Sequence, residues 1–148
     1  MDGTQKQVQI FPTESSKTAI GVYIFVVGFV YNTILRFIWQ PKGLQMLVDE
    51  MLHLVIPIVY IIYWYLNCKP KELSYKLIFK WLRYPIFYLT VVLILGSFSN
   101  YYPYPFLDVF KFGYTEVFRN IIFLTLFFGV VSGLFIVVSK IRWNKNLK

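Results

Sequence analysis

Four long stretches of the chain contain no Asp, Glu, Lys or Arg, and they determine the predicted architecture. They cover residues 18–35, 51–68, 84–107 and 120–139. A helix needs roughly 20 apolar residues to cross the hydrocarbon core of a bilayer. The stretches are apolar on every face and lack the alternating polarity of a membrane β-barrel. The pattern therefore predicts an all-α fold, a polytopic transmembrane helix bundle with about four spans.

The predicted spans cover about 18–38, 47–68, 82–99 and 117–140, within a transmembrane domain over 18–143. A polar segment (1–17) precedes this domain and a basic tail (144–148) follows it. The third helix should end near Ser97 to Asn100, because Pro103 and Pro105 follow. Residues 1–17 lack the pattern of a secretory signal, so we expect the spans to remain in the mature protein.

The basic residues indicate an orientation. If the spans alternate in direction, four basic residues lie on one side: Arg36, Lys42, Lys111 and Arg119. The other eleven lie on the side of the two termini: Lys6, Lys17, Lys69, Lys71, Lys76, Lys80, Arg83, Lys140, Arg142, Lys145 and Lys148. Loops rich in Lys and Arg stay in the cytoplasm. We expect a protein of the cell (plasma) membrane with both termini cytoplasmic.

The segment from Lys71 to Arg83 allows two interpretations. Read as a helix, it separates Leu73, Leu77 and Trp81 from its lysines, which is typical of a short interfacial helix on anionic lipid. The other interpretation is ordinary basic anchoring followed directly by the third span.

Composition excludes several functional classes. The chain of 148 residues is 57% hydrophobic and 15% charged, with a mean hydropathy of +0.57. Its net charge of +8 comes from residues scattered between apolar runs, so we expect no nucleic-acid partner. The single cysteine, Cys68, excludes an internal disulfide and a multi-cysteine metal site. We expect no cofactor.

His53 is the only histidine, and Asp49 lies one helical turn before it. Since residues four apart share a helix face, the carboxylate could orient the imidazole for general-base chemistry. The alternative is a histidine that only hydrogen-bonds to a neighbouring helix near the headgroups. The charges nearby either mark span ends or pair into a polar lid. One histidine among scattered acids is a weak metal signal, so no metal site is predicted.

The segment Tyr101 to Asp108 contains three tyrosines, two prolines and a phenylalanine. The predicted topology places it on the same outer side as His53. It is either a rigid aromatic cap over the bundle or an aromatic belt at the membrane interface.

Several short motifs carry a family resemblance. They are His53-Leu-Val-Ile-Pro57, Tyr63-Trp64, Arg83-Tyr84-Pro85, Tyr102-Pro-Tyr-Pro-Phe-Leu-Asp108 and Gly113-Tyr114, together with Tyr31-Asn32 and Leu35-Arg36. From about Thr18 onward the chain resembles the bacterial Pr6Pr family of membrane proteins. That family is distantly similar to androgen-induced membrane hydrolases, which cleave fatty acid esters of hydroxy fatty acids with an intramembrane threonine and a histidine. The resemblance implies that His53 is that histidine.

This chain departs from the family pattern. Such proteins have about six spans, and their threonine lies before the region that this chain matches. The resemblance therefore implies a truncated member, in which Thr33 is a candidate nucleophile by depth alone. One hypothesis is a non-catalytic bundle that binds membrane lipids, a second copy of itself or another membrane protein. The alternative is a lipid-ester hydrolase with His53 as general base, Asp49 as the orienting acid and Thr33 as nucleophile.

Overall fold

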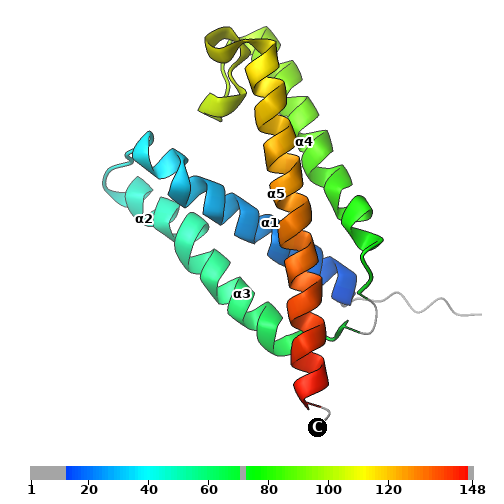
Figure 1. Cartoon of the computed structure of the whole chain (residues 1–148). Helices are drawn as coiled ribbons and strands as arrows, with labels where there is room; N and C mark the ends of the chain where they lie inside the picture. The colour runs from blue at the N-terminus through cyan, green and yellow to red at the C-terminus, as the bar shows by residue number, and fades with distance from the viewer. Residues whose placement is uncertain (1–12, 71–72, 147–148) are drawn as a thin grey trace, which may run out of the picture.

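The computed structural model describes residues 13–70 and 73–146, most of which belong to four helical segments (Figure 1). The first segment is α1 (Glu14–Thr33). The second is continuous and consists of α2 (Leu44–Glu50), a π-helical turn η2 (Met51–Val55) and α3 (Ile56–Asn67). The third and fourth are α4 (Leu77–Ser99) and α5 (Val109–Asn146). Two short 3-10 turns, η1 (Leu35–Phe37) and η4 (Pro105–Leu107), lie in the connections, and the described residues form no strand.

The helices form two antiparallel pairs that cross near one end and diverge toward the other (Figure 1). One pair is α1 with α2 and α3, and the other is α4 with α5. We call the end where Glu14, Lys69 and Leu77 lie the basic end. The opposite end, which carries the connections 34–43 and 100–108, is called the loop end. Consecutive spans therefore alternate in direction, as the charge argument assumed.

All four helical segments begin earlier than predicted, and a side chain caps two of them. The Thr13 hydroxyl accepts a hydrogen bond from the Ser16 N–H at 3.2 Å, so α1 starts at Glu14. Asp108 Oδ1 accepts from the N–H groups of Phe110 (3.0 Å) and Lys111 (3.2 Å), so the first turn of α5 starts directly after it. Gly113, with φ of 75° and ψ of 162°, then kinks α5 before its long membrane-spanning part. Such side-chain acceptors satisfy the free donors of a first helical turn.

The connection to the third span favours the second of the two interpretations given for residues 71–83. Instead of a separate interfacial helix from Lys71 to Arg83, α4 begins at Leu77 and continues without interruption to Ser99. Its basic first turns therefore belong to the third span, and residues 71–72 lie outside the described residues. The predicted end of this span is confirmed, since Asn100 follows in a left-handed conformation with φ of 55°. Asparagine tolerates that conformation better than most residues.

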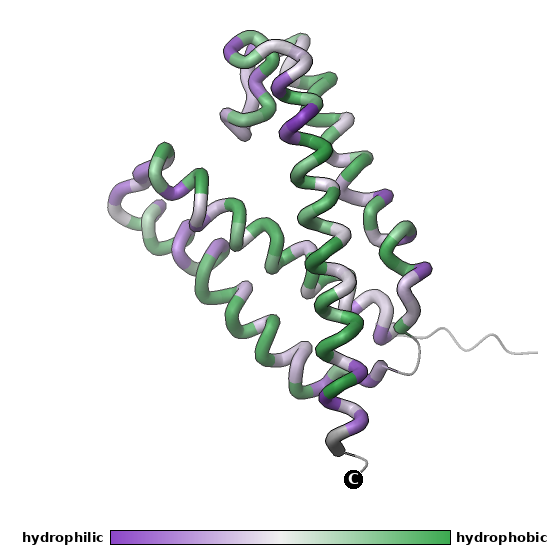
Figure 2. Tube along the Cα trace, in the orientation of Figure 1, coloured by the Kyte–Doolittle hydropathy of each residue, from purple (hydrophilic) through white to green (hydrophobic). Residues whose placement is uncertain are grey.

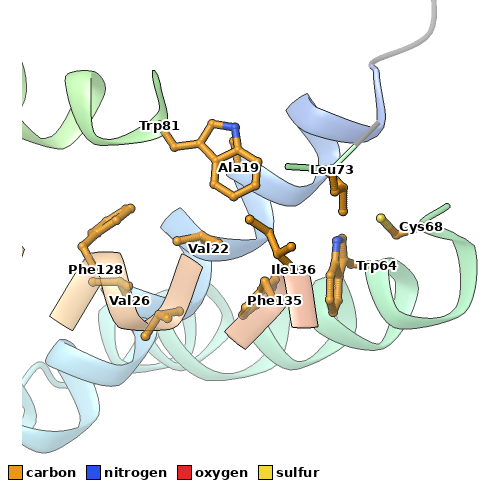
Figure 3. Packing of buried hydrophobic residues seen from close by; sticks show 11 residues of the cluster. Ala19, Val22, Val26, Trp64, Cys68, Leu73, Trp81, Phe128, Phe135 and Ile136 are labelled. Atoms are coloured by element: carbon orange, nitrogen blue, oxygen red, sulfur yellow. The ribbon is translucent and has the colours of Figure 1, made fainter. Parts of the chain in front are cut away.

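A buried cluster holds the two pairs together where they cross (Figure 3). Val22 and Ile136 have no exposed surface there, and Trp64 and Trp81 are each 3% exposed. A second cluster joins α4, α5 and the connection between them through Leu89, Val92, Tyr102, Leu107, Val109 and Val117.

Much of the remaining apolar surface is uncovered. Large hydrophobic side chains are exposed on every span, among them Phe29, Val59, Phe87 and Phe123. Hydrophobic residues dominate the middle of the helices and hydrophilic residues gather toward their ends (Figure 2). All four segments are long and apolar enough to cross a membrane. Hydrocarbon solvates this surface while each helix satisfies its own peptide groups, so the all-α transmembrane bundle is confirmed.

Candidate functional site

His53 lies on the irregular turn of the second span, toward the loop end. Residues Met51–Val55 form a π-helical turn, a feature that is frequent at functional sites. The imidazole Nδ1 lies 3.1 Å from the main-chain oxygen of Asp49 and 3.4 Å from its carboxylate Oδ1. The structure therefore brings together the two residues that the helical spacing had paired.

Tyr31 of α1, which was not among the predicted site residues, completes this group. Its ring stacks on the His53 ring with centroids 3.9 Å apart and an angle of 12° between the planes. Its phenol donates a hydrogen bond to Asp49 Oδ2. Tyr31 is only 7% exposed, so the tyrosine holds both the acid and the imidazole from the neighbouring helix.

Asn32 and Pro57 explain how α1 is fixed against this turn. A proline lacks an N–H, so Pro57 cannot donate to the carbonyl of His53 four residues earlier. Asn32 Nδ2 donates to that carbonyl at 2.9 Å and to the Gly28 carbonyl at 2.8 Å. Gly28 permits the close approach, because a Cβ there would lie 3.1 Å from the His53 oxygen and 3.2 Å from Pro57 Cγ.

Arg36 and Glu50 extend the polar group toward the loop end. Arg36 forms an ion pair with Glu50 and donates to Asn32 Oδ1 at 2.7 Å. The charges flanking these two spans are thus paired across them, as the polar-lid interpretation requires. Together, Tyr31, Asn32, Arg36, Asp49, Glu50 and His53 form what we call the polar cluster.

The aromatic connection before α5 is folded onto the bundle. Tyr102 is 8% exposed and packs directly on Gly96, where an added Cβ would overlap its ring. Asn120 Nδ2 donates to the Phe106 carbonyl at 2.8 Å, and the hydroxyls of Tyr88 and Tyr104 lie 3.0 Å apart. These contacts favour the cap interpretation over a simple interfacial belt.

Two cavities adjoin His53. The loop-end cavity, of about 130 Å³, lies between the two helix pairs. Its lining is mostly apolar and includes Val30, Leu89, Phe106, Leu124 and Phe128, with Tyr31, His53, Tyr88, Tyr104 and Thr125 as its polar members. The side cavity, of about 360 Å³, lies between α1 and the second span. It is lined by His53, Thr33, Pro57 and neighbouring apolar residues.

Thr33, the candidate nucleophile, shares the side cavity with His53 without bonding to it. Its hydroxyl donates to the Phe29 carbonyl at 2.8 Å, within its own helix. Among the residues that the structure describes, no hydrogen bond joins Thr33 to His53. Over the same residues, no group of three or more His, Cys, Asp or Glu side chains is placed to hold a metal ion.

Comparison with known proteins adds no identification. No family model, no curated protein and no solved structure matches the chain. The geometry of the two cavities and the polar cluster is thus the basis for any functional assignment.

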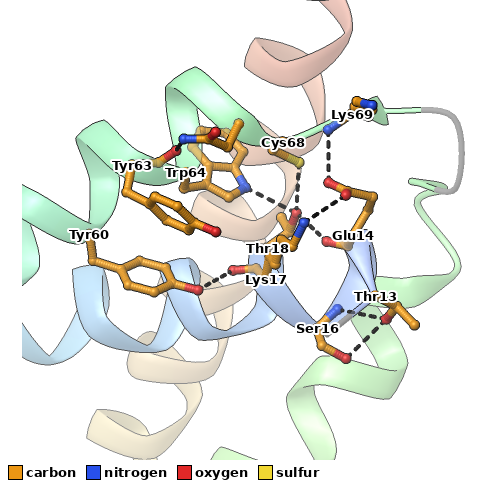
Figure 4. Close-up of polar contacts among 11 residues, drawn as sticks. Thr13, Glu14, Ser16, Lys17, Thr18, Tyr60, Tyr63, Trp64, Cys68 and Lys69 are labelled. Atoms are coloured by element: carbon orange, nitrogen blue, oxygen red, sulfur yellow. Dashed lines mark hydrogen bonds and ion pairs between the residues drawn. The ribbon is translucent and has the colours of Figure 1, made fainter. Parts of the chain in front are cut away.

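The basic end holds a second polar group, which ties the helices together (Figure 4). The Thr18 hydroxyl donates to the Glu14 carbonyl at 2.8 Å and accepts from Trp64 Nε1 at 3.0 Å. Glu14 accepts from the Lys69 N–H at 2.8 Å and pairs with Lys17 at 2.9 Å. The Thr18 hydroxyl and the Glu14 carboxylate thus bond to other groups of the protein itself. This indicates a structural clamp between α1 and the end of α3.

Cys68 belongs to this clamp and follows the end of α3. Its Sγ lies 3.4 Å from Thr18 Oγ1, and the residue is 3% exposed. Burial raises the pKa of the Cys68 thiol above its ordinary value, because a buried thiolate loses its hydration. The thiol is therefore protonated at neutral pH, consistent with a packing role.

Proposed function

We propose that this membrane protein binds a single lipid chain in the loop-end cavity. The observation that carries the proposal is the cavity itself, which is apolar, lies between the two helix pairs and borders the polar cluster. Membrane lipids surround these helices, so a chain can enter from the bilayer without crossing water.

The size of the cavity limits the ligand. A dry apolar cavity of ~150 Å³ accepts benzene, so about 130 Å³ accepts a few methylene groups. One chain end or the part of a chain next to its headgroup fits, and the rest of the chain would lie along the exposed apolar helices. A two-chain phospholipid could place only part of one chain inside.

Polar side chains in the cavity lining supply the second component of a lipid-binding site. His53 and Tyr31 reach the cavity from one helix pair, and Tyr88 and Tyr104 reach it from the other. Burial, and then the hydrogen bond with Tyr88, raise the pKa of the Tyr104 phenol, which keeps its hydroxyl protonated. Ligand pockets typically combine an apolar lining with a few convergent polar groups of this kind.

The family and the location form part of the same proposal. Residues of the Pr6Pr-like motifs, including Tyr31, His53, Pro57 and Tyr104, border one or both cavities, which supports a shared site. A plasma-membrane protein with the basic end in the cytoplasm would place the polar cluster at the outer headgroup level.

Photocrosslinking tests lipid binding directly. A long-chain alcohol with a diazirine on its chain is added to the purified protein in nanodiscs, and the labelled peptides are identified by mass spectrometry. We expect labelling of residues around the cavity, and loss of it in Leu89→Trp, which fills the cavity. Leu95→Trp is the matched control, because Leu95 lies on the same helix and is 61% exposed. Labelling spread evenly over lipid-exposed positions in all three proteins would refute the proposal.

Ester hydrolysis is the second candidate, favoured by the orientation of His53. Asp49 holds Nδ1, which leaves Nε2 as the nitrogen that could take a proton from an attacking hydroxyl. In this scheme Thr33 Oγ attacks the ester carbonyl and its proton passes to His53. The alcohol then leaves with that proton, and water hydrolyses the acyl-threonine.

A long-chain ester assay decides this candidate. Thr33→Ala should abolish turnover if the scheme holds. Thr90→Ala is its matched control, because the Thr90 hydroxyl also donates to a carbonyl in its own helix, at 2.9 Å. Equal turnover in the two variants would reject Thr33 as the nucleophile.

A further inference from the structure

The hydrogen-bond partners of His53 fix the proton on its ring. Nδ1 lies 3.1 Å from the main-chain oxygen of Asp49, and a carbonyl oxygen can only accept. Nδ1 must therefore carry a hydrogen. In the uncharged imidazole the lone pair is then on Nε2, which makes Nε2 a hydrogen-bond acceptor.

Nε2 remains available to a ligand. Within residues 13–70 and 73–146, no side chain or main-chain group hydrogen-bonds to it. Nε2 is also not fully buried. In that part of the chain, the one fully buried side-chain N or O atom without a hydrogen-bond partner is Tyr102 Oη. His53 lines both cavities, and its Nε2 is not among the fully buried unpartnered atoms of the described residues.

The charges around His53 oppose an anionic ligand. Asp49 is the nearest charge, and its Oδ1 lies 3.4 Å from His53 Nδ1. The Tyr31 phenol is already donated to Asp49. Arg36, the cation of the polar cluster, is paired with Glu50, so the cluster has more acidic than basic groups.

We propose that the loop-end cavity selects an uncharged single-chain lipid whose terminal hydroxyl donates a hydrogen bond to His53 Nε2. Long-chain alcohols and monoacylglycerols belong to this chemical class. The same chain ending in an anion would meet a lone pair and the Asp49 carboxylate. This inference rests on the proposed lipid binding and adds the identity of the headgroup.

Competition between three lipids of equal chain length tests the headgroup preference on the unaltered protein. The diazirine alcohol is crosslinked in the presence of the unlabelled alcohol, its methyl ether or the corresponding alkylsulfonate. The methyl ether retains the oxygen and lacks the donor. We expect the alcohol to compete about tenfold better than either of the others, the value of one hydrogen bond at this site.

Two variants locate the effect. His53→Phe retains a flat ring against Tyr31 and removes Nε2, so the alcohol and the methyl ether should compete equally. Thr90→Val is the matched control, because Thr90 is outside the lining of this cavity and its hydroxyl donates to the Ile86 carbonyl at 2.9 Å. This variant should retain the preference for the alcohol.

The possible failures are distinguishable. Labelling of the cavity with equal competition by alcohol and ether, or with better competition by the sulfonate, would overturn the headgroup assignment and leave lipid binding intact. A preference for the alcohol that persists in His53→Phe would also overturn it. Absence of labelling at the cavity would reject lipid binding, and the headgroup assignment with it.

Discussion

Replacing Asn32 with leucine should destabilise the bundle far more than replacing its neighbour Thr33. Asn32 Nδ2 is the side-chain donor to the His53 carbonyl, which Pro57 cannot serve. Leucine has a similar volume and no donor, so it would leave that carbonyl unsatisfied in an apolar setting.

The magnitude follows from two terms. A hydrogen bond between membrane helices contributes ~0.6 kcal/mol on average and at most ~1.7 kcal/mol. An unsatisfied buried polar group costs about 1–3 kcal/mol. Because the orphaned carbonyl is the larger effect, we expect a loss of about 2 kcal/mol, which is roughly a 30-fold change in the unfolding equilibrium. The lost contact with Arg36 adds little, since Arg36 still pairs with Glu50.

Reversible unfolding in mixed micelles, followed by the fluorescence of the buried tryptophans, measures this loss. Thr33→Val is the matched control, because the Thr33 hydroxyl bonds only within its own helix. It should change stability by less than about 0.5 kcal/mol. In a Pro57→Ala background, which restores a main-chain N–H, Asn32→Leu should cost about 1 kcal/mol less. Equal effects of Asn32→Leu and Thr33→Val would refute the role assigned to the His53 carbonyl.

Three further predictions concern other parts of the bundle. Gly96→Ala should cost about 1–3 kcal/mol in the same unfolding assay, because the added Cβ would overlap the Tyr102 ring. Gly129→Ala is the control and should cost nothing, because no atom lies within 4 Å of its Cβ position. Equal effects of the two substitutions would contradict the packing of Tyr102 on Gly96. Cys68 should react with iodoacetamide more slowly in the folded protein than in the unfolded protein, with a rate that still increases above the ordinary thiol pKa. Burial raises the pKa of the Cys68 thiol in the folded state. The buried, protonated thiol therefore contributes to stability at neutral pH, and this contribution declines at alkaline pH. Equal iodoacetamide reaction rates in the folded and unfolded protein would contradict this burial. A reporter fused after Lys140 should be cytoplasmic, and an external reporter would reverse the assigned orientation.

The spans could be predicted from the sequence because their signal is local. Length, absence of charge and the prolines after Asn100 each act within a few residues, and the structure follows them closely. The helix starts were less accurate, and two of them depend on capping side chains, those of Thr13 and Asp108. The segment near Lys76 allowed two interpretations for a related reason: amphipathic spacing there suits both an interfacial helix and the first turns of a transmembrane helix.

The candidate site was predictable only in its helical part. The spacing of four residues brought Asp49 and His53 together, as it does on any regular helix. Tyr31 could not be assigned in the same way, because it belongs to another span and its position depends on the register between the helices. A signal for that register was present in the sequence: Pro57 implies an unsatisfied carbonyl at His53, and a polar amide such as Asn32 is the kind of partner it requires.

The arrangement of polar contacts explains why a cavity can persist at the loop end. Among the described residues, the hydrogen bonds between the two helix pairs all involve Trp81, which binds Ser15 and Tyr23 toward the basic end. Beyond them the pairs diverge and are in contact through apolar and aromatic side chains, such as Phe29 with Phe127. Apolar contacts have little directional preference, so they can be exchanged for contacts with a lipid chain at small cost. The hydrogen bonds of the polar cluster all lie within the pair formed by α1 and the second span, so a bound lipid chain would not replace them. They would hold His53 in place whether the cavity is empty or filled.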